Sequence, residues 1–221
     1  MRSRFDEQLS ILNTEMIRMG ALCEEVISLA SRALTHGGDA ADRAIAVDAE
    51  IDRKERDIEG LCMKLLLLEH PVARDLRVVS SALKMISDME RIGDQAANIA
   101  EITGYISGID VPEALHIGDM ARATVKMVTD SVDSFVKNDL DMARGVMKYD
   151  DVVDGLFDKV KNGLVDLIRG GNFDAEAALD LLMVAKYFER IGDHAVNVAE
   201  WVEYSITGVR SNNETSEVSG I

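Results

Sequence analysis

The feature that most constrains the fold is an internal repeat. Residues 90–101, with the sequence ERIGDQAANIAE, return as residues 189–200, with the sequence ERIGDHAVNVAE. The copies begin at Glu90 and Glu189, 99 positions apart, which is too long for a solenoid period and suits one small helical bundle per copy. We therefore predict a tandem duplication in which each half carries the same Glu-x-x-x-Asp pair.

The composition favours packed helices over other folds. Hydrophobic residues make up 47% of the 221 residues, whereas aromatic residues make up only 5% and proline occurs twice. The formal net charge of −16 disfavours nucleic acid and anionic membrane surfaces and favours cations or basic protein surfaces as partners. Because the chain shows neither a signal peptide nor an apolar stretch long enough to span a membrane, we expect a cytoplasmic protein without direct membrane insertion.

Apolar residues recur every three or four positions in six stretches, which predicts six helices. Gly37 and Gly38 end the first stretch, Asp39 can cap the second, and the second runs to about Glu69. Pro71 fits the first turn of the third helix.

The second half follows the same plan after a linker at residues 104–112, and Gly170 with Gly171 turns the chain into the sixth helix. Short connections between helices of about thirty residues make neighbours antiparallel. We predict an all-α fold of two tandem homologous three-helix bundles, at residues 1–107 and 111–207, followed by a disordered tail at residues 208–221.

Acidic residues interrupt the apolar pattern in both halves. Glu90 and Glu189 fall where the periodicity calls for a core residue, and Asp94 and Asp193 follow on nearly the same helix face. A carboxylate buried without a partner costs several kcal/mol, and like charges four residues apart on a helix repel. A positive group is therefore expected beside each pair.

The second and fifth helices carry matching Asp-x-x-x-Asp pairs. In each half, the acidic residues of the two helices lie at similar numbers of residues before and after the turn, which is near His70 in the first half and near Gly171 in the second. Four carboxylates are therefore expected at about one level in each half: Asp48, Asp52, Glu90 and Asp94 in the first, and Asp150, Asp154, Glu189 and Asp193 in the second. An oxygen-only donor set suits Mg²⁺, Mn²⁺, Ca²⁺ or iron better than a structural zinc site, and it has room for more than one ion. Gly93 and Gly192 fit a close approach of a neighbouring backbone or ion at this level.

Other interpretations of these residues stay open at this point. The carboxylates suit a solvated acidic face on a purely structural bundle, neutralised by ordinary ion pairs with Arg91 or Arg190. They also suit a carboxylate-bridged metalloenzyme, either an oxidase or a hydrolase. Glu113-x-x-His116, expected at the start of the fourth helix, is a single copy of a motif that a di-iron bundle enzyme needs twice.

The doubled motif, together with PVARDLR at residues 71–77, the opening Phe5-Asp-x-x-Leu9 and Met19-Gly20, resembles the PhoU family of phosphate-signalling regulators. The resemblance implies two similar three-helix bundles with bound metal, iron or zinc and in places multinuclear, on the eight carboxylates named above. It also implies a non-enzymatic adaptor between a phosphate ABC transporter and a membrane sensor histidine kinase, which restrains uptake when phosphate is plentiful.

Three further expectations accompany this resemblance. A homodimer is expected, with Arg91 and Arg190 contacting the metal ligands or a partner. Asp88 aligns with Tyr187 in the second copy, so the two sites would differ if Asp88 served as an additional metal ligand.

Overall fold

The computed structural model describes residues 2–68, 74–106, 111–171 and 173–210, and within these ranges it contains helices and no strand. The predicted all-α fold with six long helices is confirmed. In chain order the elements are α1 (Arg2–His36), α2 (Ala40–Leu68), α3 (Arg74–Ile102), the 3-10 helix η1 (Glu113–Leu115), α4 (Ile117–Lys137), α5 (Leu140–Arg169) and α6 (Ala175–Thr207).

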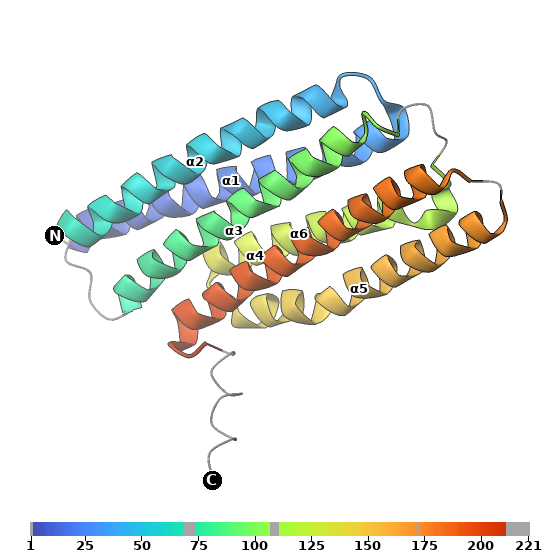
Figure 1. The fold of residues 1–221 in the computed structure, drawn as a ribbon. Coiled ribbons are helices and arrows are strands. Elements are labelled where there is room, and N and C mark those ends of the chain that lie inside the picture. Colours follow the sequence, from blue (N-terminus) through green and yellow to red (C-terminus); the bar gives the residue numbers. More distant parts are fainter. Residues whose placement is uncertain (1, 69–73, 107–110, 172, 211–221) are drawn as a thin grey trace, which may run out of the picture.

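The six long helices lie side by side, each antiparallel to the next in the chain (Figure 1). Helices α1, α2 and α3 pack on one another, as do α4, α5 and α6, so the two repeats form two three-helix bundles. The bundles are then joined by α3 against α6 and by α1 against α4, and a continuous cluster of buried apolar residues runs through both. The sequence predicted the bundles and left open how they pack.

The helix ends follow the local signals in the sequence. Gly37 and Gly38, with φ angles of 63° and 76°, separate α1 from α2, and Gly171, with φ of 70°, lies between α5 and α6. Positive φ is a conformation that glycine adopts without steric cost, so these residues stop one helix and turn the chain into the next. Asp139 and Asp174 cap α5 and α6 by accepting hydrogen bonds from the backbone N–H groups of Met142 and Ala177.

The fourth helix differs from the prediction. It has 21 residues instead of about thirty, and Glu113 lies in η1 and not at its start. His116 separates the two elements because its φ of 60° is left-handed and cannot continue a right-handed helix. The prediction that Glu113-x-x-His116 begins the fourth helix is therefore wrong.

Several predictions fall outside the described residues. These are the end of the second helix at Glu69, the turn at His70, Pro71, the middle of the linker and residues 211–221 of the tail. The exact domain limits therefore stay a prediction.

Candidate functional site

The eight predicted carboxylates lie on the two helix pairs that the repeat relates. Asp48 and Asp52 on α2 face Glu90 and Asp94 on α3, and we call these four residues the first acidic site. The second acidic site comprises the equivalent residues of α5 and α6, namely Asp150, Asp154, Glu189 and Asp193. In each site the charges of one helix act on the carboxylates of the other, so the predicted match in level agrees with the packing.

The carboxylates lie at the border of the core and not inside it, which corrects the expectation for Glu90 and Glu189. The side chains of Glu90, Asp94 and Glu189 are 21%, 34% and 17% exposed, and Asp193 is exposed. The fully buried positions next to Glu90 are taken by Met89 and Ile92. A border position leaves room for water or an ion to reach the oxygens, and it lowers the cost of holding several charges there.

Asp48 is the most confined carboxylate of the first site. Its Oδ1 atom is buried and has no hydrogen-bond partner among the described residues. A Cβ atom placed on Gly93 would lie only 2.6 Å from this oxygen, so the glycine makes the space that Asp48 occupies. Burial, followed by the charges of Asp94, Asp52 and Glu101, raises the pKa of Asp48 to about 6.

The second site repeats this arrangement around Asp150. A Cβ atom on Gly192 would lie 3.3 Å from Asp150 Oδ1, so the approach is close but less tight than in the first site. Burial, followed by the charges of Asp154, Asp193 and Glu189, raises the pKa of Asp150 to about 6. The two repeats therefore resemble each other in sequence and also in the raised pKa of one aspartate in each site.

Basic side chains neutralise only part of each site. Arg91 Nη1 donates to Asp94 Oδ2 at 2.8 Å, and Arg91 Nε lies 3.5 Å from Glu90 Oε2. In the second site Lys186 pairs with Glu189, a contact that was not predicted from the sequence although the i, i+3 spacing allows it. The pKa of Glu90 is nevertheless raised, by burial first and then by its acidic neighbours. The pKa of Asp193 is also raised, because the protein around this exposed side chain removes part of its hydration and because Glu189 lies nearby.

The donor chemistry fits a cation, although the described side chains are not yet arranged around one. Within the part of the chain that the structure describes, no three His, Cys, Asp or Glu side chains converge closely enough to hold a metal ion. Each site still combines several carboxylates with one basic side chain, and the first has an unpartnered buried oxygen at Asp48. Because no three of these side chains converge as they stand, binding an ion would require the carboxylates of the two helices in each site to draw closer together.

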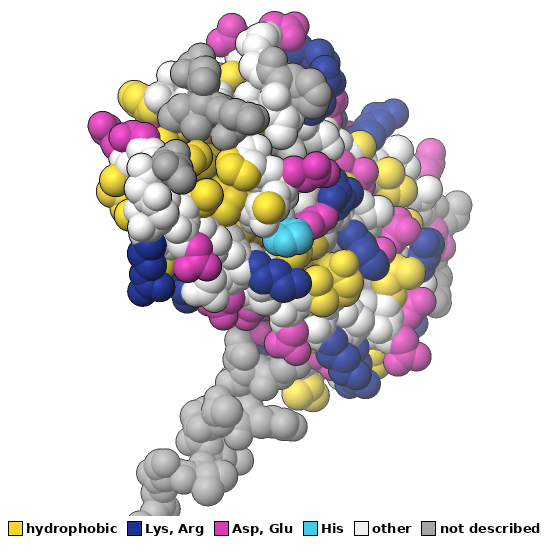
Figure 2. Space-filling view, turned by 90° about the vertical axis from the view of Figure 1, so that its right-hand side faces the viewer, with side chains coloured by type: hydrophobic (Ala, Val, Ile, Leu, Met, Phe, Trp, Pro, Cys, Tyr) yellow, Lys and Arg dark blue, Asp and Glu magenta, His cyan; other side chains and the backbone are white. Residues whose placement is uncertain are grey.

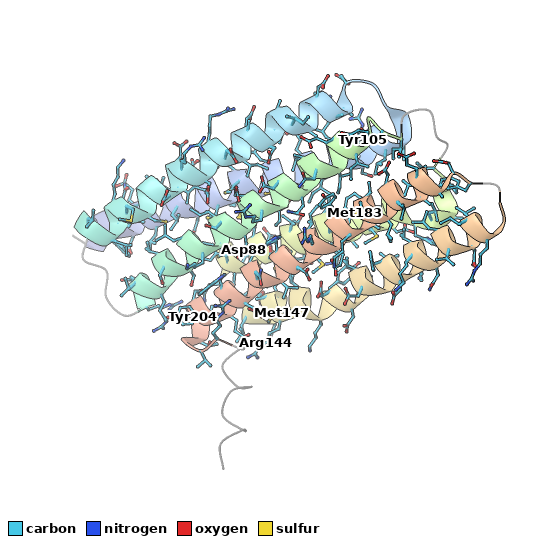
Figure 3. The ribbon with its side chains drawn as sticks, viewed as in Figure 1. Asp88, Tyr105, Arg144, Met147, Met183 and Tyr204 are labelled. Atoms are coloured by element: carbon cyan, nitrogen blue, oxygen red, sulfur yellow. The ribbon has the colours of Figure 1, made fainter. Side chains whose placement is uncertain are left out.

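Asp88 does not join the first acidic site but faces α6. Its Oδ1 atom accepts hydrogen bonds from His194 Nδ1 and Asn197 Nδ2, both at 3.0 Å. Figure 3 labels Asp88 where α3 and α6 run alongside each other. The hypothesis that Asp88 is an additional metal ligand is therefore not supported by its position.

A cavity of about 660 Å³ lies away from both sites, between the end of α1 and the start of α4. Its polar side chains include His116 and Arg122, and both pair with Asp119 in its wall. Figure 2 shows this end of the molecule, where acidic, basic and apolar side chains are interspersed. Two of the three Asp, Glu, Lys or Arg side chains in its wall, Asp119 and Arg122, therefore compensate each other, and the cavity lacks the cluster of carboxylates found at each acidic site.

No helix among the described residues is both long and apolar enough to cross a membrane.

Comparisons with known proteins point to one family. The sequence model of the PhoU domain matches residues 16–103 and again residues 117–202. A phosphate-specific transport system accessory protein PhoU homolog 1 from Thermotoga maritima is 34% identical over 207 residues, which covers 92% of this chain and 89% of that protein. A PhoU homolog from Clostridium acetobutylicum is also 34% identical and covers 94% of this chain and 96% of its own length.

Solved structures agree with the sequence relatives. The crystal structure of PhoU from Pseudomonas aeruginosa superposes with a TM-score of 0.85 at 30% identity, covering 93% of this chain and 100% of that one. The phosphate transport system regulatory protein PhoU from Streptococcus pneumoniae gives a TM-score of 0.85 at 27% identity, covering 93% and 98% of the two chains.

Proposed function

Because the chain belongs to the PhoU family, we propose that it acts as an accessory regulator of phosphate transport. The family match spans both repeats, and it carries the proposal together with the acidic site that each repeat retains. The family consists of transport accessory and regulatory proteins, so the expectation that the chain is not an enzyme is confirmed. The carboxylate-bridged metalloenzyme is set aside.

The proposed mode of action is that of an adaptor in the cytoplasm. It would connect a phosphate ABC transporter with a membrane sensor histidine kinase and restrain uptake when phosphate is plentiful. A net charge of −16 supports docking to basic surfaces of such partners, because opposite charges accelerate encounter and orient it. A homodimer is part of this proposal.

The proposal includes a metal ion at each acidic site. Asp48, Asp52, Glu90 and Asp94 would hold it in the first site, and Asp150, Asp154, Glu189 and Asp193 in the second. When bound, the ion supplies positive charge that lets neighbouring carboxylates coexist and ties α2 to α3 or α5 to α6. Iron or zinc follows from the family resemblance, and the oxygen-only donor set also suits Mg²⁺ or Mn²⁺.

Uptake of radiolabelled inorganic phosphate tests the transport role. Cells that lack the gene and grow in phosphate-rich medium are expected to take up phosphate faster than cells that carry it. Restoring the gene should return uptake to the original rate, whereas unchanged uptake in the deletion strain would contradict the proposal. Purification of the tagged protein from membranes, with the transporter and kinase identified among the recovered proteins, tests the two proposed partners separately.

Elemental analysis tests the metal component independently of transport. We expect D48N/E90Q and D150N/E189Q each to lose part of the bound metal and the fourfold variant to lose nearly all of it, because the carboxylates are the donors. D158N is the matched control, since Asp158 is an exposed acid of α5 that pairs only with Lys161 in the described contacts. Equal metal content in all variants would remove the site assignment.

A further inference from the structure

The two bundles are connected by a polar bridge in the middle of the α3–α6 interface. It consists of Asp88 on α3 with His194 and Asn197 on α6, and we call it the Asp88–His194 bridge. The side chains of Asp88 and His194 are only 18% and 23% exposed. A carboxylate that accepts two hydrogen bonds in a partly buried interface holds its donors in a defined position, because breaking either bond leaves charge without compensation.

The bridge occurs once although the molecule is duplicated. At the equivalent positions of the other repeat, 99 residues away, Tyr187 corresponds to Asp88 and Gln95 corresponds to His194. These two residues cannot form the same contact between a carboxylate and an imidazole. Gln95 Oε1 is instead buried without a hydrogen-bond partner among the described residues. The interface between the two repeats is therefore asymmetric here, although the motifs at residues 90–101 and 189–200 are nearly identical in sequence.

The Asp88–His194 bridge connects α3, which carries residues of the first acidic site, to α6, which carries residues of the second. Asp88 precedes Glu90 by two residues, and residues two apart point to nearly opposite sides of a helix. Asp88 thus faces α6 while Glu90 faces the acidic residues of α2. On α6, His194 directly follows Asp193 of the second site. Asp88 of α3 therefore contacts α6 next to a carboxylate of the second site.

We propose that Asp88 and His194 are positioning residues that couple ion binding at one acidic site to ion binding at the other. The proposal rests on the metal component of the proposed function. Helices move as rigid bodies, and Gly93 leaves α3 in direct contact with Asp48, so closing the first site around an ion displaces α3. The Asp88–His194 bridge transfers this displacement to α6, and the affinity of the second site changes with it.

Titration calorimetry with Mn²⁺ on the full chain measures the coupling. The dissociation constant of the second site is determined with the first site intact and with the first site disabled by E90Q/D94N. We expect the two values to differ by about fivefold or more, the range of ordinary coupling between sites. The ratio of these two dissociation constants should fall to near one in D88A and in H194A. The double variant D88A/H194A should behave like either single variant.

The control is E24Q, which weakens another hydrogen bond between the bundles. Glu24 accepts from Thr129 Oγ1 at 2.8 Å between α1 and α4, and neither of these helices carries a residue of the acidic sites. We expect E24Q to retain the parental ratio. An unchanged ratio in D88A and H194A, with Mn²⁺ still bound, would overturn the coupling alone, and so would an equal loss in E24Q. Absence of Mn²⁺ binding to the parent would overturn the metal component and the coupling together. Far-UV circular dichroism confirms that each variant is folded before it is titrated.

Discussion

Single residues of the repeated motif have unequal surroundings in the two halves, and Gly93 and Gly192 show this most directly. Alanine gains about 1 kcal/mol over glycine inside a helix. At position 93 the added Cβ would meet Asp48 Oδ1 at 2.6 Å and Ile51 Cδ1 at 3.0 Å, and such overpacking costs about 1–3 kcal/mol. At position 192 the nearest atom, Asp150 Oδ1, is 3.3 Å away, so it has to move by only a few tenths of an ångström and the overpacking costs less than at position 93.

We therefore expect G93A to be at least about 1 kcal/mol less stable than G192A. Urea unfolding of the two variants and the parent measures this difference. Equal stability of the two variants would mean that Asp48 and Ile51 move away at little cost.

The pKa values of Asp48 and Asp150 predict a specific pH dependence. Both are raised to about 6 from an ordinary value of 3.8, so the folded state binds the proton more tightly than the unfolded state. The stability that this gives is complete below the ordinary pKa and is lost as the pH rises through about 6. Asparagine at either position has no proton to lose.

Without metal, the free energy of unfolding of D48N or D150N relative to the parent should increase by on the order of 1–2 kcal/mol between about pH 4 and pH 6 and stay constant above. Urea titrations over this range, with a chelator present, give the comparison. If the free energy of unfolding changed with pH in the same way in variant and parent, the pKa of the replaced aspartate would not be raised. Adding Mn²⁺ to the parent should remove the loss, because the ion favours the ionised carboxylates.

Whole elements depend on local signals that are independent of the acidic sites. Asp139 and Asp174 cap α5 and α6 through hydrogen bonds of 3.0 Å and 2.9 Å to backbone N–H groups. Replacing either residue with alanine should cost about 1 kcal/mol, the usual value of a helix cap. D158A, which removes an exposed acid in the middle of α5, is expected to change stability by less than about 0.5 kcal/mol. Thermal unfolding followed by circular dichroism compares the three, and a cap variant as stable as D158A would contradict the assignment.

The approach of α1 to α4 depends on Gly20. A Cβ atom at this position would lie 3.2 Å from Val132 Cγ2, so only a glycine brings the two helices to their observed separation without a shift of Val132. Gly20 belongs to the Met19-Gly20 pair on which the family resemblance partly rests. Its physical role is therefore contact between the bundles, which no pattern within a single helix indicates.

The molecule as a whole should unfold as one unit. Chains longer than about 150 residues often unfold domain by domain, and two tandem repeats favour that behaviour. Here α3 packs against α6 more extensively than any other pair of described helices, and the apolar core is continuous across the repeats. Trp201, the single tryptophan, lies on α6 and reports on the second bundle, whereas far-UV circular dichroism reports on all helices.

We therefore expect urea transitions followed by Trp201 fluorescence and by circular dichroism to coincide. Separate midpoints would show that the bundles unfold independently and that the α3–α6 interface is weaker than its packing suggests.

The sequence by itself determined the helices, their order and the residues of the two acidic sites. These follow from interactions between residues close in the chain: apolar spacing specifies a helix face, positive-φ glycines and capping aspartates end helices, and a repeated Glu-x-x-x-Asp places two carboxylates on one face. Even the pairing of α2 with α3 follows, because a short connection leaves an antiparallel neighbour as the simplest arrangement.

Only the tertiary structure decided what lies between helices that are distant in the chain. The periodicity placed Glu90 in the core, but packing gave the buried positions to Met89 and Ile92 and left Glu90 at the border. Asp88 was a candidate ligand by alignment, and packing turned it to His194, 106 residues away. Such contacts depend on how rigid helices fit together across the interface of the two bundles, a property of side-chain shape and helix orientation that the spacing of residues along one helix does not contain.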